Sequence, residues 1–489
     1  MPYIIGIDQS TQGTKVMLFD AQGKILLRLD HPHRQIIDEN GWVEHDPEEI
    51  YRNLIDLVQS LMAQSGISGQ EIAAVGISNQ RETAMAWDRA TLAPVYNAIV
   101  WQCARGKAIC GGIEAQGLAE TVRQKTGLRL SPYFSAAKLS WIMENVPDVR
   151  SRALKGEICV GTMDSYLVHR LTHGQAFRTD YSNASRTQLF NISTLQWDEE
   201  LCRIFGIPMV CLGEVTDSDG FFGETDFEGM LPKKVPIHGV MGDSHGALFG
   251  QGCRKPGMMK ATYGTGSSIM MNIGESPIFS DQGIVTSLAW KTNGKVKYVL
   301  EGNINYTGAV ITWLKDDMHL LRSAGESEQM AREADPADHA YIVPAFSGLG
   351  APYWQADAEA AIIGMRRTTG QKEIVKAGLS AIAYQITDVV KLMQQAASLP
   401  DVELRVDGGP TRNGWLMQFQ SDITNAVLRV PQAEELSAIG AAYAAGLSIG
   451  LYDEDIFTKT VYKTFCPQMA QQERDALYQG WLDAVKRVL

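Results

Sequence analysis

The stretch that decides the fold is residues 4–20, Ile-Ile-Gly-Ile-Asp-Gln-Ser-Thr-Gln-Gly-Thr-Lys-Val-Met-Leu-Phe-Asp. One apolar run ends at Asp8, turn-forming residues follow over 9–15, and a second apolar run covers 16–19. This pattern predicts a strand, a turn and a second strand. The turn gathers backbone N–H groups, Thr hydroxyls and Lys15, which suit a phosphate chain, and Asp8 could hold the Mg²⁺ that phosphates need. An ordinary polar hairpin tip is the plainer alternative for this segment alone.

A second copy of the pattern lies about half a chain away. Residues 258–271 read Met-Met-Lys-Ala-Thr-Tyr-Gly-Thr-Gly-Ser-Ser-Ile-Met-Met, which again predicts strand, Gly-Thr-Gly turn and strand. Two such hairpins suggest two related domains that face each other across a nucleotide. Other nucleotide motifs fail, because Ile269 stands where a dinucleotide fingerprint needs a third Gly and Met258 stands where a Walker motif needs Lys.

Composition bounds the class of protein. A chain of 489 residues suits two domains, and 45% apolar with 20% charged residues is typical of a globular protein. No apolar run is long enough to span a membrane and no leader pattern precedes the first strand, so we expect a cytoplasmic protein without a membrane partner. The seven cysteines are odd in number and form no C-x-x-C pair, which argues against disulfides and zinc. A net charge of −12 disfavours nucleic acid as a partner.

Strand and helix patterns alternate along the chain, which is typical of an α/β protein with mixed sheets. Asp46 and Pro47 predict the start of a helix that runs to about Gln64, with Glu49 as a capping-box residue. Glycines cluster over 246–257, so we expect domains at 1–249 and 250–489. The same reasoning predicts strands over 72–77, 235–241 and 404–407, and helices over 373–396 and from about 413.

Residues at the carboxyl ends of the expected strands are the first candidates for a site, since ligands of open α/β sheets bind there. Each has a plainer alternative. Asp243 could only cap a helix, Arg81 and Glu82 could be a solvated ion pair, and Gly408-Gly409 could be an ordinary tight turn. In the same way, Trp101 and Tyr133 could be core aromatics.

Several long, irregular stretches resemble the FGGY carbohydrate kinase family, and within it the glycerol kinases, over nearly the whole chain. The first family signature is met by residues 134–142, including Lys138 and Trp141, whereas the second, over 360–380, is broken by Gly378 and Ser380. The other matching stretches are 41–47, 78–83, 97–103, 179–186, 262–266, 343–354 and 416–422.

The resemblance implies two actin- and hexokinase-like (ribonuclease H-like) domains with a cleft between them that closes on ATP and a small polyol or ketose. It implies Asp243 as general base on the substrate hydroxyl and Asp8 as the Mg²⁺ residue, and it implies a homo-oligomer. Phosphoryl transfer itself favours one carboxylate near the attacking oxygen. The remaining implied residues are Thr11, Gln12, Lys15 and Thr265 at the phosphates, Gly308, Thr312, Gly409 and Asn413 around the nucleotide, and Arg81, Glu82, Trp101 and Tyr133 at the substrate.

Two departures from the glycerol kinase pattern fall in the substrate pocket. Ser244 stands where those kinases have Gln, and Ser268 stands where they have Phe. Both changes lose bulk, and the second replaces an apolar wall by a hydroxyl, which favours an acceptor longer than glycerol, with about four to five carbons. The phosphate loop also differs, at Ser10 and Gln12, and residues 229–234 lack the Gly-rich, Arg-bearing stretch through which bacterial glycerol kinases bind a sugar-bisphosphate inhibitor. We therefore expect a polyol or ketose kinase, with glycerol kinase and a non-enzymatic, actin-like nucleotide switch as the alternatives.

Overall fold

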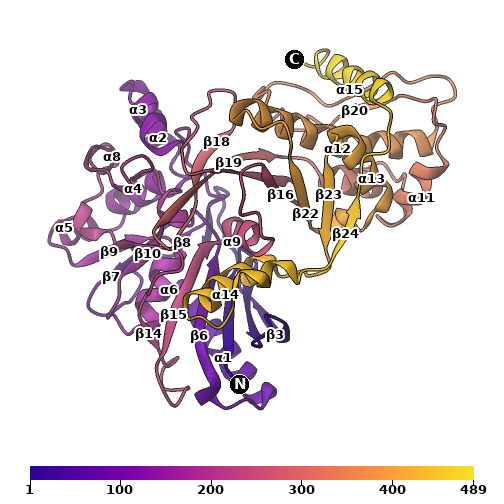
Figure 1. The fold of residues 1–489 in the computed structure, drawn as a ribbon. Coiled ribbons are helices and arrows are strands. Elements are labelled where there is room, and N and C mark those ends of the chain that lie inside the picture. Colours follow the sequence, from indigo (N-terminus) through magenta and orange to yellow (C-terminus); the bar gives the residue numbers. More distant parts are fainter.

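The computed structural model describes residues 1–489 and consists of two open β-sheets with helices packed around them. Figure 1 shows the N-terminal half, in indigo to magenta, beside the C-terminal half, in orange to yellow. The predicted hairpins over 4–20 and 258–271 both form, one in each sheet.

The first sheet has six strands in the order β14-β15-β6-β1-β2-β3. Neighbours β1, β2 and β3 run antiparallel, whereas β6 and β15 run parallel to β1. The register places Asp8 opposite Lys15 at the turn of the first hairpin. The strands are β1 (Tyr3–Gln9), β2 (Gly13–Phe19), β3 (Ile25–Pro32), β6 (Ile72–Asn79), β14 (Glu224–Thr225) and β15 (Val235–Gly242).

The second sheet repeats this arrangement in seven strands, in the order β18-β19-β17-β16-β22-β23-β24. Strands β16, β17 and β19 are antiparallel neighbours, and β22 and β23 run parallel to β16. Two sheets of the same mixed order confirm the predicted pair of ribonuclease H-like α/β domains. The strands are β16 (Met258–Tyr263), β17 (Ser267–Gly274), β18 (Val285–Thr292), β19 (Lys295–Ile304), β22 (Glu403–Asp407), β23 (Val427–Pro431) and β24 (Tyr462–Phe465).

Helix α14 (Leu436–Ser448) links the two halves, because it belongs to the C-terminal half of the chain but packs on α9 (Asp243–Gly250) and on β15, β6 and β1. Gly239 permits this approach. It has φ of 68°, and a Cβ there would lie 2.1 Å from the carbonyl oxygen of Ala441. Figure 1 shows α14 beneath α9, against the first sheet.

The remaining helices and strands surround the two sheets. On the first half they are the strands β4 (Ile36–Ile37), β5 (Val43–His45), β7 (Met85–Asp88), β8 (Ala98–Ile99), β9 (Ile158–Gly161), β10 (Arg178–Asp180), β11 (Phe190–Asn191), β12 (Gln196–Trp197) and β13 (Glu214–Thr216), with the helices α1 (Pro47–Ser65), α2 (Lys107–Ala115), α3 (Ala119–Thr126), α4 (Ser135–Asn145), α5 (Val149–Leu154), α6 (Met163–Leu171), α7 (Tyr181–Ala184) and α8 (Glu199–Phe205). On the second half they are β20 (Tyr341–Val343), β21 (Ala361–Ile363), α10 (Gly308–Asp316), α11 (Glu326–Glu333), α12 (Gln371–Ala397), α13 (Gly414–Thr424) and α15 (Gln471–Val485). Short 3₁₀ turns cover 69–71, 209–211, 409–412 and 454–458.

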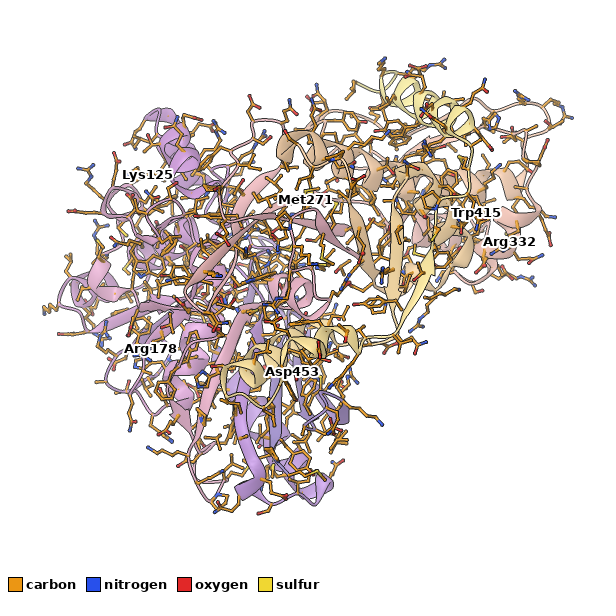
Figure 2. The ribbon with its side chains drawn as sticks, viewed as in Figure 1. Lys125, Arg178, Met271, Arg332, Trp415 and Asp453 are labelled. Carbon is orange, nitrogen blue, oxygen red and sulfur yellow. The ribbon has the colours of Figure 1, made fainter.

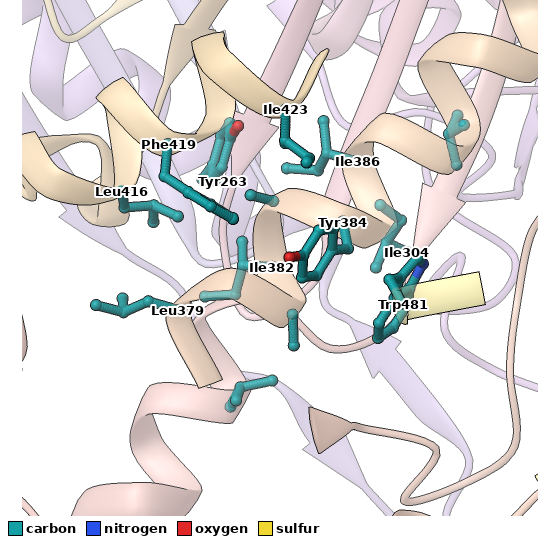
Figure 3. Packing of buried hydrophobic residues seen from close by; sticks show 14 of the residues in the cluster. Tyr263, Ile304, Leu379, Ile382, Tyr384, Ile386, Leu416, Phe419, Ile423 and Trp481 are labelled. Carbon is teal, nitrogen blue, oxygen red and sulfur yellow. The ribbon is translucent and has the colours of Figure 1, made fainter. Parts of the chain in front are cut away.

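Helix α12 is the centre of the largest apolar core, as its amphipathic pattern predicts. Figure 3 shows Ile382 and Tyr384 of α12 against Phe419 of α13 and Trp481 of α15. The rings of Tyr384 and Trp481 stack with centroids 5.3 Å apart. This core packs on one face of the second sheet, whose opposite face shares a separate apolar cluster with residues of the first half. Figure 2 places Arg332 and Trp415 at the far end of this second half, opposite Arg178 on the first half.

One local prediction is wrong. Asp46 caps α1 by accepting the N–H of Glu48, but Glu49 does not complete a capping box. Its carboxylate accepts the N–H of Arg34 at 3.1 Å instead, and so satisfies a backbone donor of the preceding loop. No helix of the structure combines the length and the apolar character that crossing a membrane requires.

Candidate active site

The turn of the first hairpin presents a buried carboxylate. Asp8 is 4% exposed, and its Oδ1 makes no hydrogen bond within the protein. Burial raises the pKa of Asp8 to about 6, although the positive charge of Lys15 lowers it and the negative charge of Asp243 raises it. A buried carboxylate oxygen without a partner fits a divalent cation such as Mg²⁺, which takes oxygen ligands.

Lys15 and Gln12 lie at the same turn, but the side chain of Lys15 is paired with carboxylates whereas that of Gln12 is not. The Nζ of Lys15 lies 3.6 Å from Asp8 Oδ2 and 2.7 Å from Glu435, which precedes α14. Glu435 also pairs with Arg28 of β3, so one carboxylate ties α14 to two strands of the first sheet. Gln12 is exposed at the tip, and its side chain makes no hydrogen bond within the protein. Its amide is therefore free to meet a ligand.

Two aromatic residues connect this turn to the candidate residues that follow β6 and β15. Trp101 donates its Nε1–H to Oγ1 of Thr11 at 3.0 Å, and its ring meets that of Tyr133 edge-on at 5.6 Å. Lys138 of α4 holds the segment of Tyr133 by donating to its carbonyl oxygen. Both aromatics are half-buried rather than core residues, so the core alternative does not describe them.

Arg81 and Glu82 follow β6, and they do not form the solvated pair of the alternative interpretation. Their side chains are buried and turn to different partners. Arg81 donates to Glu301 of β19 at 2.8 Å, and Glu82 accepts from Arg186 at 2.6 Å. Glu82 has φ of 58°, a left-handed conformation that costs about 1 kcal/mol in a residue with a side chain. The buried ion pairs hold this strained turn in place.

Asp243 begins α9, directly after β15. It is not the N-cap, which is Gly242, although its Oδ1 accepts the N–H of Ser244 at 2.6 Å. The same oxygen lies 3.2 Å from Nε of Arg81, and the side chain is 34% exposed. Oδ2 makes no hydrogen bond within the protein. One carboxylate oxygen is thus held in place while the other can accept a proton from a ligand.

The second sheet supplies the opposite wall. Ser268 of β17 lies directly opposite Asn303 of β19, so their side chains share a face with Glu301. The hydroxyl of Ser268 is buried and makes no hydrogen bond within the protein, and Asn303 is exposed with its Nδ2 3.5 Å from Glu301. This wall is polar, because Ser268 contributes a hydroxyl at the position where the sequence analysis expected an apolar side chain to be lost.

A cavity of about 660 Å³ lies on the second half, beside the Gly-Thr-Gly turn. Gly408 has φ of 101°, and a Cβ there would lie 2.0 Å from the carbonyl oxygen of Tyr263, so only glycine fits. Asn413 caps α13 and also donates to Ser327 across the cavity. The cavity is lined by the residue of this half expected at the phosphates, Thr265, and by the four expected around the nucleotide, Gly308, Thr312, Gly409 and Asn413.

The structure adds residues to the site that the sequence reasoning did not identify. Glu301 and Arg186 complete the buried ion network around Arg81, and Glu435 pairs with Lys15. A signal for Glu301 existed, because it is the one charged residue in the otherwise uncharged stretch 298–302. A lone charge in such a stretch indicates a buried partner of opposite sign.

Comparison with known proteins gives a consistent result. The model of the FGGY family of carbohydrate kinases, N-terminal domain, matches residues 3–250, and that of the C-terminal domain matches 259–449. Glycerol kinase 1 of Thermotoga maritima is 48% identical over 100% of this chain and 99% of its own length. The structure of Plasmodium falciparum glycerol kinase with ADP superposes with a TM-score of 0.95 at 35% identity, covering 100% of this chain and 98% of that one. A ligand-bound xylulose kinase from Lactobacillus acidophilus shares the fold, with a TM-score of 0.88 at 21% identity over 100% and 98% of the two chains.

Proposed function

Since this chain belongs to the FGGY family of carbohydrate kinases, and is thus an ATP-dependent phosphotransferase with an alcohol acceptor, we propose that it phosphorylates a terminal hydroxyl of a small polyol or ketose with about four to five carbons. The observation that carries the acceptor size is the Ser268 hydroxyl, which is buried without a partner. An unpaired buried hydroxyl is costly, and an additional acceptor hydroxyl would satisfy it. A polar wall also discriminates more strongly than an apolar one, because a substrate lacking the hydroxyl leaves it unpaired.

Glycerol is the second candidate acceptor. It is favoured by the relatives at 48% and 44% identity, which are glycerol kinases. Trp101, Tyr133, Arg81 and Glu82 agree with either acceptor, since they would contact the carbon skeleton and the hydroxyls that the two share. The non-enzymatic switch has no support among these relatives.

In the proposed mechanism Asp243 is the general base. Its Oδ2 accepts the proton of the attacking hydroxyl, while Oδ1 stays fixed by Ser244 N–H and Arg81. Arg81 and Glu82 hydrogen-bond the remaining hydroxyls, and Trp101 and Tyr133 orient the carbon skeleton. Because phosphoryl transfer depends mainly on positioning and charge neutralisation, these fixed contacts supply most of what the protein must contribute.

The nucleotide side is proposed to use both hairpin turns. Lys15, Thr11 and Gln12 would meet the phosphates from the first half, and Thr265 from the second. Gly308, Thr312, Gly409 and Asn413 line the cavity of about 660 Å³ that would hold the nucleoside. Mg²⁺, when bound near Asp8, would neutralise phosphate charge.

We further propose domain limits of 1–249 and 250–489, a homo-oligomer, either a dimer or a tetramer, and a location in the cytoplasm. The family matches to 3–250 and 259–449 support the domain limits. Sedimentation analysis of the purified protein tests the oligomer.

A screen of acceptors tests the proposed function. Purified protein with Mg²⁺ and ATP is offered glycerol, tetritols, pentitols, tetruloses and pentuloses in turn, and ADP release is measured for each. Mass spectrometry of the product shows whether a terminal hydroxyl carries the phosphate. No ADP release with any of these acceptors would contradict the proposal.

A further inference from the structure

A fully buried glutamate of the second half, Glu301, holds two arginines of the first half. Its side chain is 0% exposed, and its Oε2 lies 2.8 Å from Nη1 of Arg81 and 3.2 Å from Nη1 of Arg186. The other nitrogens, Nη2 of both arginines, lie 3.3 and 3.4 Å from Oε1. One carboxylate therefore lies against the ends of two guanidinium groups and joins the two halves of the chain.

The remaining Nε of each arginine lies beside a second carboxylate. Arg81 Nε lies 3.2 Å from Asp243, the proposed base, and Arg186 Nε lies 2.6 Å from Glu82. A guanidinium is a planar fork, so fixing its two ends fixes the direction of the third nitrogen. The directions of both Nε–H groups are thus set by Glu301.

We propose that Glu301 is a positioning residue of the acceptor site. Through Arg81 it sets the orientation of the Asp243 carboxylate, and through Arg186 it sets that of Glu82. Glu301 itself does not contact the reacting atoms in this scheme. The inference rests on the proposed function, since it takes the acceptor to bind beside Asp243.

The charges around Glu301 agree with this role. Burial alone would raise the pKa of Glu301, but Arg186 and Arg81 outweigh burial and hold it well below its ordinary value. The group is thus ionised at neutral pH. Without this negative charge the two guanidinium groups would repel each other, and each would turn further toward its other carboxylate. Asp243 would then be more strongly paired and a weaker base, and Glu82 would be less available to acceptor hydroxyls.

Two variants of Glu301 test the proposal. Glu301→Gln keeps the shape and removes the charge, while Glu301→Asp keeps the charge but is one methylene too short to span both arginines. Glu275→Gln is the control, because Glu275 forms an exposed ion pair with Lys297 at 2.8 Å near the end of the same sheet. For each variant, kcat and the KM for acceptor and for ATP are measured, together with thermal unfolding. The acceptor is the one that wild type uses with the highest kcat/KM.

We expect both Glu301 variants to lose about 100-fold in kcat/KM for the acceptor, the size of loss that follows a misplaced reacting group, while the KM for ATP changes less than about threefold. The control should match wild type. If Glu301→Gln does not fold, Glu301→Asp decides the question by the same criterion.

A KM for ATP that rises as much as the KM for the acceptor, or a lower melting temperature with unchanged kinetics, would overturn the proposal and leave Glu301 a structural residue. Failure of the proposed function is distinguishable from this, since it shows in wild type alone, as absent turnover of every polyol and ketose. If glycerol is the best acceptor, the Glu301 test proceeds unchanged with glycerol.

Discussion

Replacing Asp243 with asparagine removes a charge and a proton acceptor but keeps the shape of the side chain. The amide oxygen can still accept the N–H of Ser244, as Oδ1 does at 2.6 Å. Arg81 loses a partner at 3.2 Å but keeps Glu301 at 2.8 Å, so no buried charge becomes unpaired. The lost pair is 34% exposed on the Asp243 side, and pairs of this kind contribute at most about 1 kcal/mol to stability.

The catalytic cost of Asp243→Asn should be far larger than the cost in stability. General-base assistance is worth about 10² to 10⁴ in rate, or about 3 to 5 kcal/mol in activation free energy. We therefore expect kcat to fall by about that factor, with acceptor and ATP affinities within a few-fold of wild type.

The assay is ADP release coupled to a reporter, with calorimetric titration of ATP and acceptor. Asp217→Asn serves as control, because Asp217 is a similarly exposed carboxylate, paired with Lys291 at 3.0 Å, outside the proposed site. If Asp243→Asn retains more than about a tenth of wild-type kcat, the base assignment is refuted.

Three further changes probe the metal residue, the acceptor wall and the core. Asp8→Ala should lose activity that excess Mg²⁺ restores only in part, and unchanged activity at limiting Mg²⁺ would exclude Asp8. The double variant Ser268→Phe with Ser244→Gln should lower the KM for glycerol and exclude longer acceptors, which changes the preference between the two acceptors by about 10- to 200-fold. Each single variant is measured as well, because the two sites are expected to interact. An unchanged ratio of kcat/KM for the two acceptors would count against the polar-wall argument. Tyr478 donates to Asp388 at 2.6 Å, and burial raises the pKa of Asp388 to about 6, above its ordinary value of 3.8. The folded protein therefore holds this proton more tightly than the unfolded chain, and the free energy of unfolding falls as the pH rises from about 4 to about 6. Tyr478→Phe should raise the pKa of Asp388 further and lower the free energy of unfolding, measured with urea, by about 1–2 kcal/mol at pH 7.5 but by less at pH 4.5. Equal losses at the two pH values would contradict the assignment.

The hairpins were predictable from the sequence because their pattern is local. In residues 4–20 and 258–271 the apolar runs and the polar turn are adjacent, so neighbouring residues determine the pairing. The order of the strands within each sheet could not be predicted in this way, since β1 pairs with β6 across about sixty intervening residues. The packing of α14 on the first sheet likewise depends on contacts between residues about 200 to 360 positions apart, such as Gly239 and Gly76 with Ala441.

The same limit applies to the candidate site. The positions of Arg81, Glu82 and Asp243 at strand ends follow from local patterns, and the structure brings Arg81 and Asp243 into contact. Their other partners do not follow, because Arg81 and Glu301 are 220 residues apart in sequence. Charge complementarity alone does not show which of the many glutamates pairs with Arg81, because that choice depends on the fold. The sequence could therefore predict which residues reach the site but not which buried residues hold them.

The most direct measurement is the ratio of kcat/KM for the best acceptor of four or five carbons to that for glycerol, with both acceptors competing in one reaction. The Ser268 hydroxyl, which has no partner within the protein, predicts a ratio of about 10 or more, because the additional hydroxyl of the longer acceptor would satisfy it. A ratio below one would contradict the enlarged, polar pocket and assign glycerol as the acceptor.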